Sequence, residues 1–180
     1  MLLKEKQYLA GIGKDLQQKY KRGVRLLERG EYLEAEENFA ELREKIPAFV
    51  PLYNKWAIIY IHRQDYGKAR DLLEEALALD GEYAPAICNL GNIARAEGNL
   101  ELAKEYYLKA IEIDEEYGPA YNNLGVVYRE EGDIKRSVKY LKRANKYRSY
   151  YPDLAGNPAG CIIPLLLGLI ALIFLFYIMR

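Results

Sequence analysis

Apolar and small residues recur along this chain with helical spacing, and the same arrangement returns every 34 residues. In the stretch that begins at Tyr121, one face of a helix is formed by residues at i, i+3, i+4 and i+7, namely Tyr121, Leu124, Gly125 and Tyr128. Gly132 can then adopt the left-handed conformation that ends a helix, and Asp133 can cap the next one. The pattern therefore predicts two short helices joined by a tight turn.

This arrangement divides most of the chain into four contiguous segments, which are 16–49, 50–83, 84–117 and 118–151. The eighth place of each segment holds a small residue, in order Gly23, Ala57, Gly91 and Gly125. The twenty-fourth place holds a bulky one, in order Phe39, Leu73, Tyr107 and Leu141. A single helical hairpin cannot bury its own apolar face, so we expect neighbouring hairpins to stack into a right-handed solenoid.

The four segments resemble the tetratricopeptide repeat (TPR) family, whose unit is a helix–turn–helix of 34 residues. The first segment departs from the pattern, because Lys19 and Arg22 stand where an aromatic residue and a leucine are usual. A polar outer face is expected of an end repeat. The resemblance implies an all-α fold, a right-handed α-solenoid of four TPR units that follows a lead-in segment over residues 1–15.

In the resembled family, the first helix of each unit lines a concave groove that binds protein partners. Transferred to this chain, the polar groove places are Asn54, Lys55, His62, Asn89, Asn92, Arg95, Asn122, Asn123 and Arg129. An asparagine side chain carries a donor and an acceptor, so a row of them can pair with the backbone of an extended peptide. The alternative interpretation is that asparagine is simply common at these places in the family.

Some members of the family hold the C-terminal carboxylate of a chaperone through lysine, asparagine and arginine at five groove places. Counted from the second segment, those places here hold Asn54, Ile58, Asn89, Pro119 and Asn123. At most one of the five matches, whether the count starts at the first or the second segment. We therefore expect no binding of chaperones through a carboxylate clamp.

The last part of the chain has a different composition, because residues 161–179 contain no charged side chain. As a helix they would extend about 28 Å, close to the ~30 Å hydrocarbon core of a bilayer. The alternative is a capping helix packed on the last repeat, but such a helix is normally amphipathic, whereas this stretch is apolar all round. The sequence therefore predicts a transmembrane helix over 161–179, after a linker over 152–160.

Basic residues precede the predicted span, and only Arg180 follows it. This asymmetry, and a start without an apolar run long enough for a signal peptide, predict a single-pass C-terminal anchor with the repeats in the cytoplasm. The same basic residues predict a membrane-proximal surface that contacts a partner protein or lipid headgroups, made of Lys135, Lys139, Lys142, Arg143 and Lys146. The alternative is a solvated basic helix.

Charge and candidate chemistry exclude several classes of function. Lys+Arg and Asp+Glu both number 26, and the acidic middle segments would repel phosphate, so we expect no nucleic-acid partner. Cys88, Cys161 and His62 lack metal-ligand spacing, and no catalytic motif is present. The sequence therefore predicts neither an enzyme nor a cofactor.

These observations together predict a membrane-anchored TPR adaptor or scaffold. It would bind protein partners on the cytoplasmic side, through an extended peptide segment or a membrane-complex subunit, and help to assemble a complex. The alternative is a fixed accessory subunit of a membrane enzyme or transport complex.

Deletion of residues 161–180 should move the protein from the membrane fraction to the soluble fraction and leave its helical content per residue largely unchanged. The reason is that the uncharged stretch is separated from the repeats by a linker rich in proline and glycine. Membrane flotation and far-UV circular dichroism measure the two effects. A shortened chain that still floats with membranes, or that loses its helical signal, contradicts the prediction.

Overall fold

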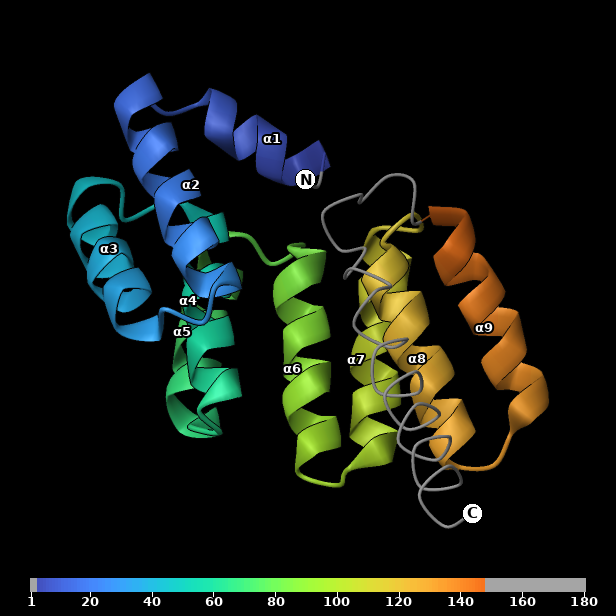
Figure 1. The fold of residues 1–180 in the computed structure, drawn as a ribbon. Coiled ribbons are helices and arrows are strands. Elements are labelled where there is room, and N and C mark those ends of the chain that lie inside the picture. The colour runs from blue at the N-terminus through green and yellow to red at the C-terminus, as the bar shows by residue number, and fades with distance from the viewer. Residues whose placement is uncertain (1–2, 148–180) are drawn as a thin grey trace, which may run out of the picture.

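The computed structural model describes residues 3–147, and in this range the regular secondary structure consists of helices joined by short turns (Figure 1). The helices are α1 Leu3–Ala10, α2 Lys14–Glu28, α3 Tyr32–Lys45, α4 Val50–His62, α5 Tyr66–Leu79, α6 Ala84–Ala96, α7 Leu100–Ile113, α8 Gly118–Glu130 and α9 Ile134–Tyr147. The predicted linker and the predicted transmembrane helix over 161–179 lie outside the described residues. Between residues 3 and 147, no helix is long and apolar enough to cross a bilayer.

Helices α2 to α9 form four consecutive hairpins that stack side by side into a solenoid (Figure 1). The pairs are α2 with α3, α4 with α5, α6 with α7, and α8 with α9. The predicted all-α solenoid of TPR-type hairpins is therefore confirmed over the described residues.

In the turn inside each hairpin, the fifteenth residue of the 34-residue unit adopts the left-handed backbone conformation. Gly30, Gly98 and Gly132 have φ of 77°, 83° and 82° there, and Gln64 has φ of 60° in the second hairpin. A residue with a Cβ pays about 1–2 kcal/mol for this conformation, so glycine is the favourable choice at three of the four turns.

The two helices of a hairpin approach closely where a small residue faces a bulky one. Phe39, Leu73 and Tyr107 are each completely buried. A Cβ built on Gly91 would lie 2.6 Å from Cε1 of Tyr107, so only glycine leaves room for that ring. In the last hairpin Leu141 is only half-buried, because no described repeat follows it.

Ion pairs connect each hairpin to the next at a fixed spacing. Arg63 lies 2.7 Å from Glu36, Lys104 lies 2.5 Å from Glu131, and Arg70 pairs with Glu97. In every pair the twenty-first place of one unit contacts the fourteenth place of the next.

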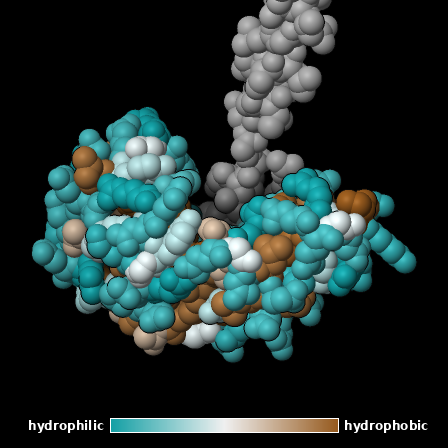
Figure 2. All heavy atoms as spheres, turned by 90° about the horizontal axis from the view of Figure 1, so that it is seen from below, coloured by the Kyte–Doolittle hydropathy of each residue, from teal (hydrophilic) through white to brown (hydrophobic). Residues whose placement is uncertain are grey.

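The surface seen in Figure 2 is mostly hydrophilic, with small apolar patches between the polar side chains.

The lead-in predicted over residues 1–15 is more structured than a simple extension. It contains α1, and α2 already begins at Lys14. Helix α1 runs across the edge of the solenoid at which α2, α4 and α6 begin (Figure 1). Part of this edge is therefore covered by α1.

Substitution of Gly91 by alanine should destabilise the protein by about 1–3 kcal/mol, because the new methyl group overlaps the Tyr107 ring. The matched control is Gly67→Ala in α5, where a Cβ comes no closer than 3.8 Å to Asp65. The control should be neutral or stabilising by up to about 1 kcal/mol. Chemical denaturation followed by circular dichroism gives both values, and equal effects would contradict this account of the close approach.

Candidate protein-binding groove

Four asparagines predicted to line the groove are hydrogen-bonded in a continuous chain across three repeats. Nδ2 of Asn89 donates to Oδ1 of Asn54 at 2.8 Å, and Nδ2 of Asn92 donates to Oδ1 of Asn89 at 2.9 Å. Nδ2 of Asn123 then donates to Oδ1 of Asn92 at 2.7 Å. This asparagine chain (Asn54, Asn89, Asn92 and Asn123) links α4, α6 and α8 through their side chains.

Burial limits what the asparagine chain can offer a partner. Asn54 is 3% exposed, and the other three members are half-buried. The prediction of a row of amides that all face a peptide therefore needs correction at Asn54, whose amide is buried against its neighbours. The neighbouring Asn122 is exposed, and its Nδ2 lies 3.4 Å from Oδ1 of Asn123.

Two buried residues of the core, Tyr107 and Cys88, contact the asparagine chain. The hydroxyl of the fully buried Tyr107 donates to Oδ1 of Asn92 at 2.9 Å, so Asn92 takes part in three hydrogen bonds. Nδ2 of Asn123 also lies 3.6 Å from Sγ of Cys88. Burial raises the pKa of the Cys88 thiol to about 12, so this group stays protonated and unreactive at neutral pH.

The predicted groove cations differ in their surroundings. Arg95 is held by Glu130, with Nη2 2.5 Å from Oε1 and Nε 3.2 Å from each carboxylate oxygen. The hydrogen bond from Arg95 lowers the pKa of Glu130. Lys55 is half-buried on α4, and Arg129 is exposed on α8 beside the ion pair.

His62 lies apart from the asparagine chain. It is eight residues beyond Asn54, which is about 12 Å along a helix. Its ring stacks on Tyr32 of α3, with centroids 5.5 Å apart and an interplanar angle of 19°. The side chain is exposed and belongs to the contact between the first two hairpins.

The predicted basic surface lies on α9, where Lys135, Lys139, Lys142, Arg143 and Lys146 are all exposed. The helix contains no acidic residue. Ile134 and Val138 are also exposed, at 59% and 45%, whereas Leu141 and Tyr147 are half-buried against α8. Arg143 lies 5.8 Å from the centre of the Tyr121 ring.

Sequence reasoning missed two sets of contacts. The ion pairs between units could have been found, because opposite charges recur at places 21 and 14 of consecutive units. The contacts of α1 could not have been found from the sequence, because Glu5 and Tyr8 lie outside the repeats and no periodicity indicates their partners.

Comparison with known proteins agrees with this geometry. The model of the tetratricopeptide repeat family matches residues 49–116 and 82–146, which together make up more than half of the chain. The chain therefore belongs to the tetratricopeptide repeat family, whose fold is a scaffold for protein–protein contacts. A search of curated proteins finds no match.

Several solved structures share the fold. The crystal structure of MamA is 24% identical, with a TM-score of 0.58 over 83% of this chain and 87% of that one. The pilF protein of Pseudomonas aeruginosa is 20% identical, with a TM-score of 0.65 over 77% of this chain and 63% of that one. The first TPR of Spaghetti, bound to an HSP90 peptide, is 22% identical, with a TM-score of 0.56 over 65% and 93%. At these identities the likeness shows the fold alone.

Replacement of Asn92 by alanine should destabilise the protein by about 1–3 kcal/mol, because the hydroxyl of Tyr107 and the amide of Asn123 both lose their acceptor. Asn122→Ala is the matched control on the next hairpin. It should change stability by less than about 0.5 kcal/mol, because the side chain is exposed. Urea unfolding gives the free energy of unfolding of both variants. A loss as small for Asn92→Ala as for Asn122→Ala would show that the asparagine chain contributes nothing to stability.

Proposed function

We propose that this TPR protein is a membrane-anchored adaptor that binds an extended, acidic segment of a partner protein along α4, α6 and α8. One observation carries the proposal, which is the charge of these three helices. They contain a single acidic residue, Glu130, and Arg95 neutralises it. Lys55 and Arg129 then leave the groove positively charged.

The asparagine chain gives this surface a defined shape. One of its hydrogen bonds joins α6 to α4 and another joins α8 to α6, so the spacing between these three helices is set before any partner arrives. A preorganised surface loses less entropy on binding than a mobile one. The exposed Asn122 and the half-buried amides at its side supply hydrogen-bonding groups for a peptide backbone.

The recognition proposed here does not use a carboxylate clamp. Among the similar structures, the first TPR of Spaghetti is bound to the HSP90 peptide SRMEEVD, which supports peptide binding as a function of this fold. In this chain, however, Asn54 is buried, and Ile58 and Pro119 carry no polar side-chain group at two of the clamp places. An internal acidic segment is therefore the partner we propose, and not a free C-terminus.

Membrane attachment and a cytoplasmic position for the repeats belong to the same proposal. They are supported by the uncharged stretch over 161–179 and by the basic residues that precede it. Basic side chains near an anionic leaflet contribute about 1 kcal/mol each to attraction. The basic residues of α9 are exposed, as such a contact requires.

A second candidate, a fixed accessory subunit of a membrane complex, is favoured by the end of the solenoid. Ile134 and Val138 occupy the places at which α7 carries Leu100 and Lys104. Those two are half-buried within the array, whereas Ile134 and Val138 are exposed. An apolar end of this kind is suited to a partner that stays bound.

Charge reversal in the groove should weaken partner capture. We expect Arg129→Glu to lower the recovery of cross-linked partners at least fivefold when the full chain is purified from membranes in mild detergent. Lys109→Glu on α7 is the matched control, because Lys109 is exposed and lies outside the groove helices.

Quantitative mass spectrometry of the cross-linked proteins reads out both variants. Equal recovery by Arg129→Glu and Lys109→Glu would remove the groove from the proposal. A partner recovered in stoichiometric amounts from both variants would favour the accessory subunit.

A further inference from the structure

Helix α1 makes specific polar contacts with segments far away in the sequence. Oε1 of Glu5, which is 5% exposed, accepts a hydrogen bond from the hydroxyl of Tyr20 at 2.6 Å. Nζ of Lys4 and the hydroxyl of Tyr8 both lie 2.7 Å from Oδ2 of Asp80. Burial alone would raise the pKa of Asp80, but the hydrogen bonds from Lys4 and Tyr8 hold it below its usual value.

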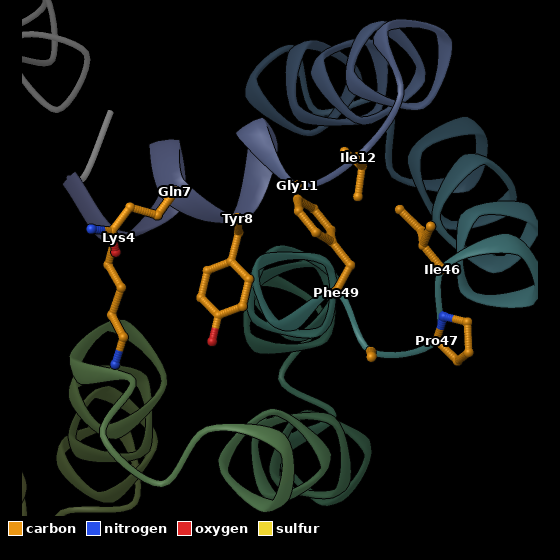
Figure 3. Close-up of a pocket in the computed structure, with 9 residues that line it drawn as sticks. Lys4, Gln7, Tyr8, Gly11, Ile12, Ile46, Pro47 and Phe49 are labelled. Carbon is orange, nitrogen blue, oxygen red and sulfur yellow. The ribbon is translucent and has the colours of Figure 1, made fainter.

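The apolar side of α1 packs into the same edge of the solenoid. Leu9 is 4% exposed and belongs to the core of the first two hairpins. The Tyr8 ring makes edge-to-face contacts with Phe49 and Tyr83, with centroid distances of 6.2 Å and 6.1 Å. Figure 3 shows Tyr8 and Lys4 pointing from α1 toward the starts of α4 and α6. One short helix thus contacts residues of the first two units, 16–49 and 50–83.

Helix α1 has little stability of its own. It has eight residues, and helices shorter than about 12–15 residues are marginal by themselves in water. The segment 11–13 that links it to α2 contains two glycines, and a Cβ on Gly13 would meet nothing within 4 Å. A hollow of about 520 Å³ separates this link from the segment 46–49 (Figure 3). Docking, and not intrinsic helix stability, keeps α1 in place.

The position of α1 coincides with part of the groove series. Tyr20 occupies the fifth place of its unit, which Asn54, Cys88 and Asn122 occupy in the units that follow. Glu5 covers Tyr20, which is 1% exposed. Helix α1 therefore contacts the first member of this series through the hydrogen bond between Tyr20 and Glu5.

We propose that the edge formed by the starts of α2, α4 and α6 is a docking surface for a short amphipathic helix with the pattern Glu-x-x-Tyr-Leu, and that α1 occupies it as a displaceable strap. The glutamate meets Tyr20, the tyrosine meets Asp80, Phe49 and Tyr83, and the leucine enters the core. A partner helix with the same side chains competes with α1 for this surface. The proposal does not depend on the acidic partner of the groove.

Binding of the α1 segment in trans tests the proposal on the full chain in detergent. The probe is a fluorescein-labelled peptide of residues 1–13, and the opened variant carries Tyr8→Ala and Leu9→Ala, which leave the docking surface intact. We expect this variant to bind the peptide at least tenfold more tightly than the unmodified chain, in which the tethered α1 competes at a high effective concentration.

Two controls make this measurement specific. The Lys6→Ala chain should behave like the unmodified one, because Lys6 is exposed on α1. A peptide in which alanine replaces Tyr8 and Leu9 should not bind the opened variant. Fluorescence anisotropy that shows no binding to the opened variant, or equal binding to opened and unmodified chains, overturns the proposal.

Amide hydrogen exchange on the unmodified chain provides a test that needs no variant. A displaceable strap opens locally, so the amides of α1 should exchange at least 100-fold faster than those of α4 to α8. They should also exchange more slowly than those of an unstructured peptide, because α1 is docked most of the time. Exchange of α1 at the rate of the central helices would show that it opens only when the whole solenoid unfolds, and would overturn the proposal.

Discussion

The structure depends on the contact between a small residue in the first helix of each hairpin and a bulky residue in the second. At Gly91 there is no space for even one methyl group beside the Tyr107 ring. This approach forms a closely packed hairpin whose remaining apolar surface can be buried only by the next hairpin. The stacked array, the alignment of its first helices and the surface of α9 that no further described hairpin covers all follow from that requirement.

Polar contacts between units then determine the relative position of the hairpins. Ion pairs at a constant spacing connect each second helix to the hairpin that follows, and the asparagine chain connects the first helices to one another. The ion pairs repeat because the sequence repeats, whereas the two asparagine contacts between units join different places, since Asn89 bonds Asn54 and Asn123 bonds Asn92. The asparagine chain has a double consequence, since the bonds that hold α4, α6 and α8 in register also use hydrogen-bonding groups that a peptide would otherwise meet.

The first and last hairpins of the described solenoid differ in how their outward surfaces are covered. At the first end, α1 covers the edge with a buried carboxylate–phenol contact and a leucine in the core. At the other end, α9 exposes Ile134 and Val138 among basic side chains. The first helices of the hairpins carry net positive charge, whereas most acidic residues lie on the second helices and in the turns. These differences distinguish three surfaces for contacts with other molecules.

The sequence by itself determined the hairpins, their number between residues 16 and 147, and the small and bulky places at which they meet, because a helical period and a repeat length are local properties. It also predicted the candidate groove residues, which lie on α4, α6 and α8. Only the tertiary structure decided that Asn54 is buried, that Arg95 is neutralised by Glu130, and that His62 stacks on Tyr32. Each of these outcomes depends on side chains about 30 residues apart that are brought together by stacking. The docking of α1 was the least predictable of these contacts. It joins Tyr8 to Asp80, and Tyr8 lies outside the repeats, so no periodicity indicates its partner.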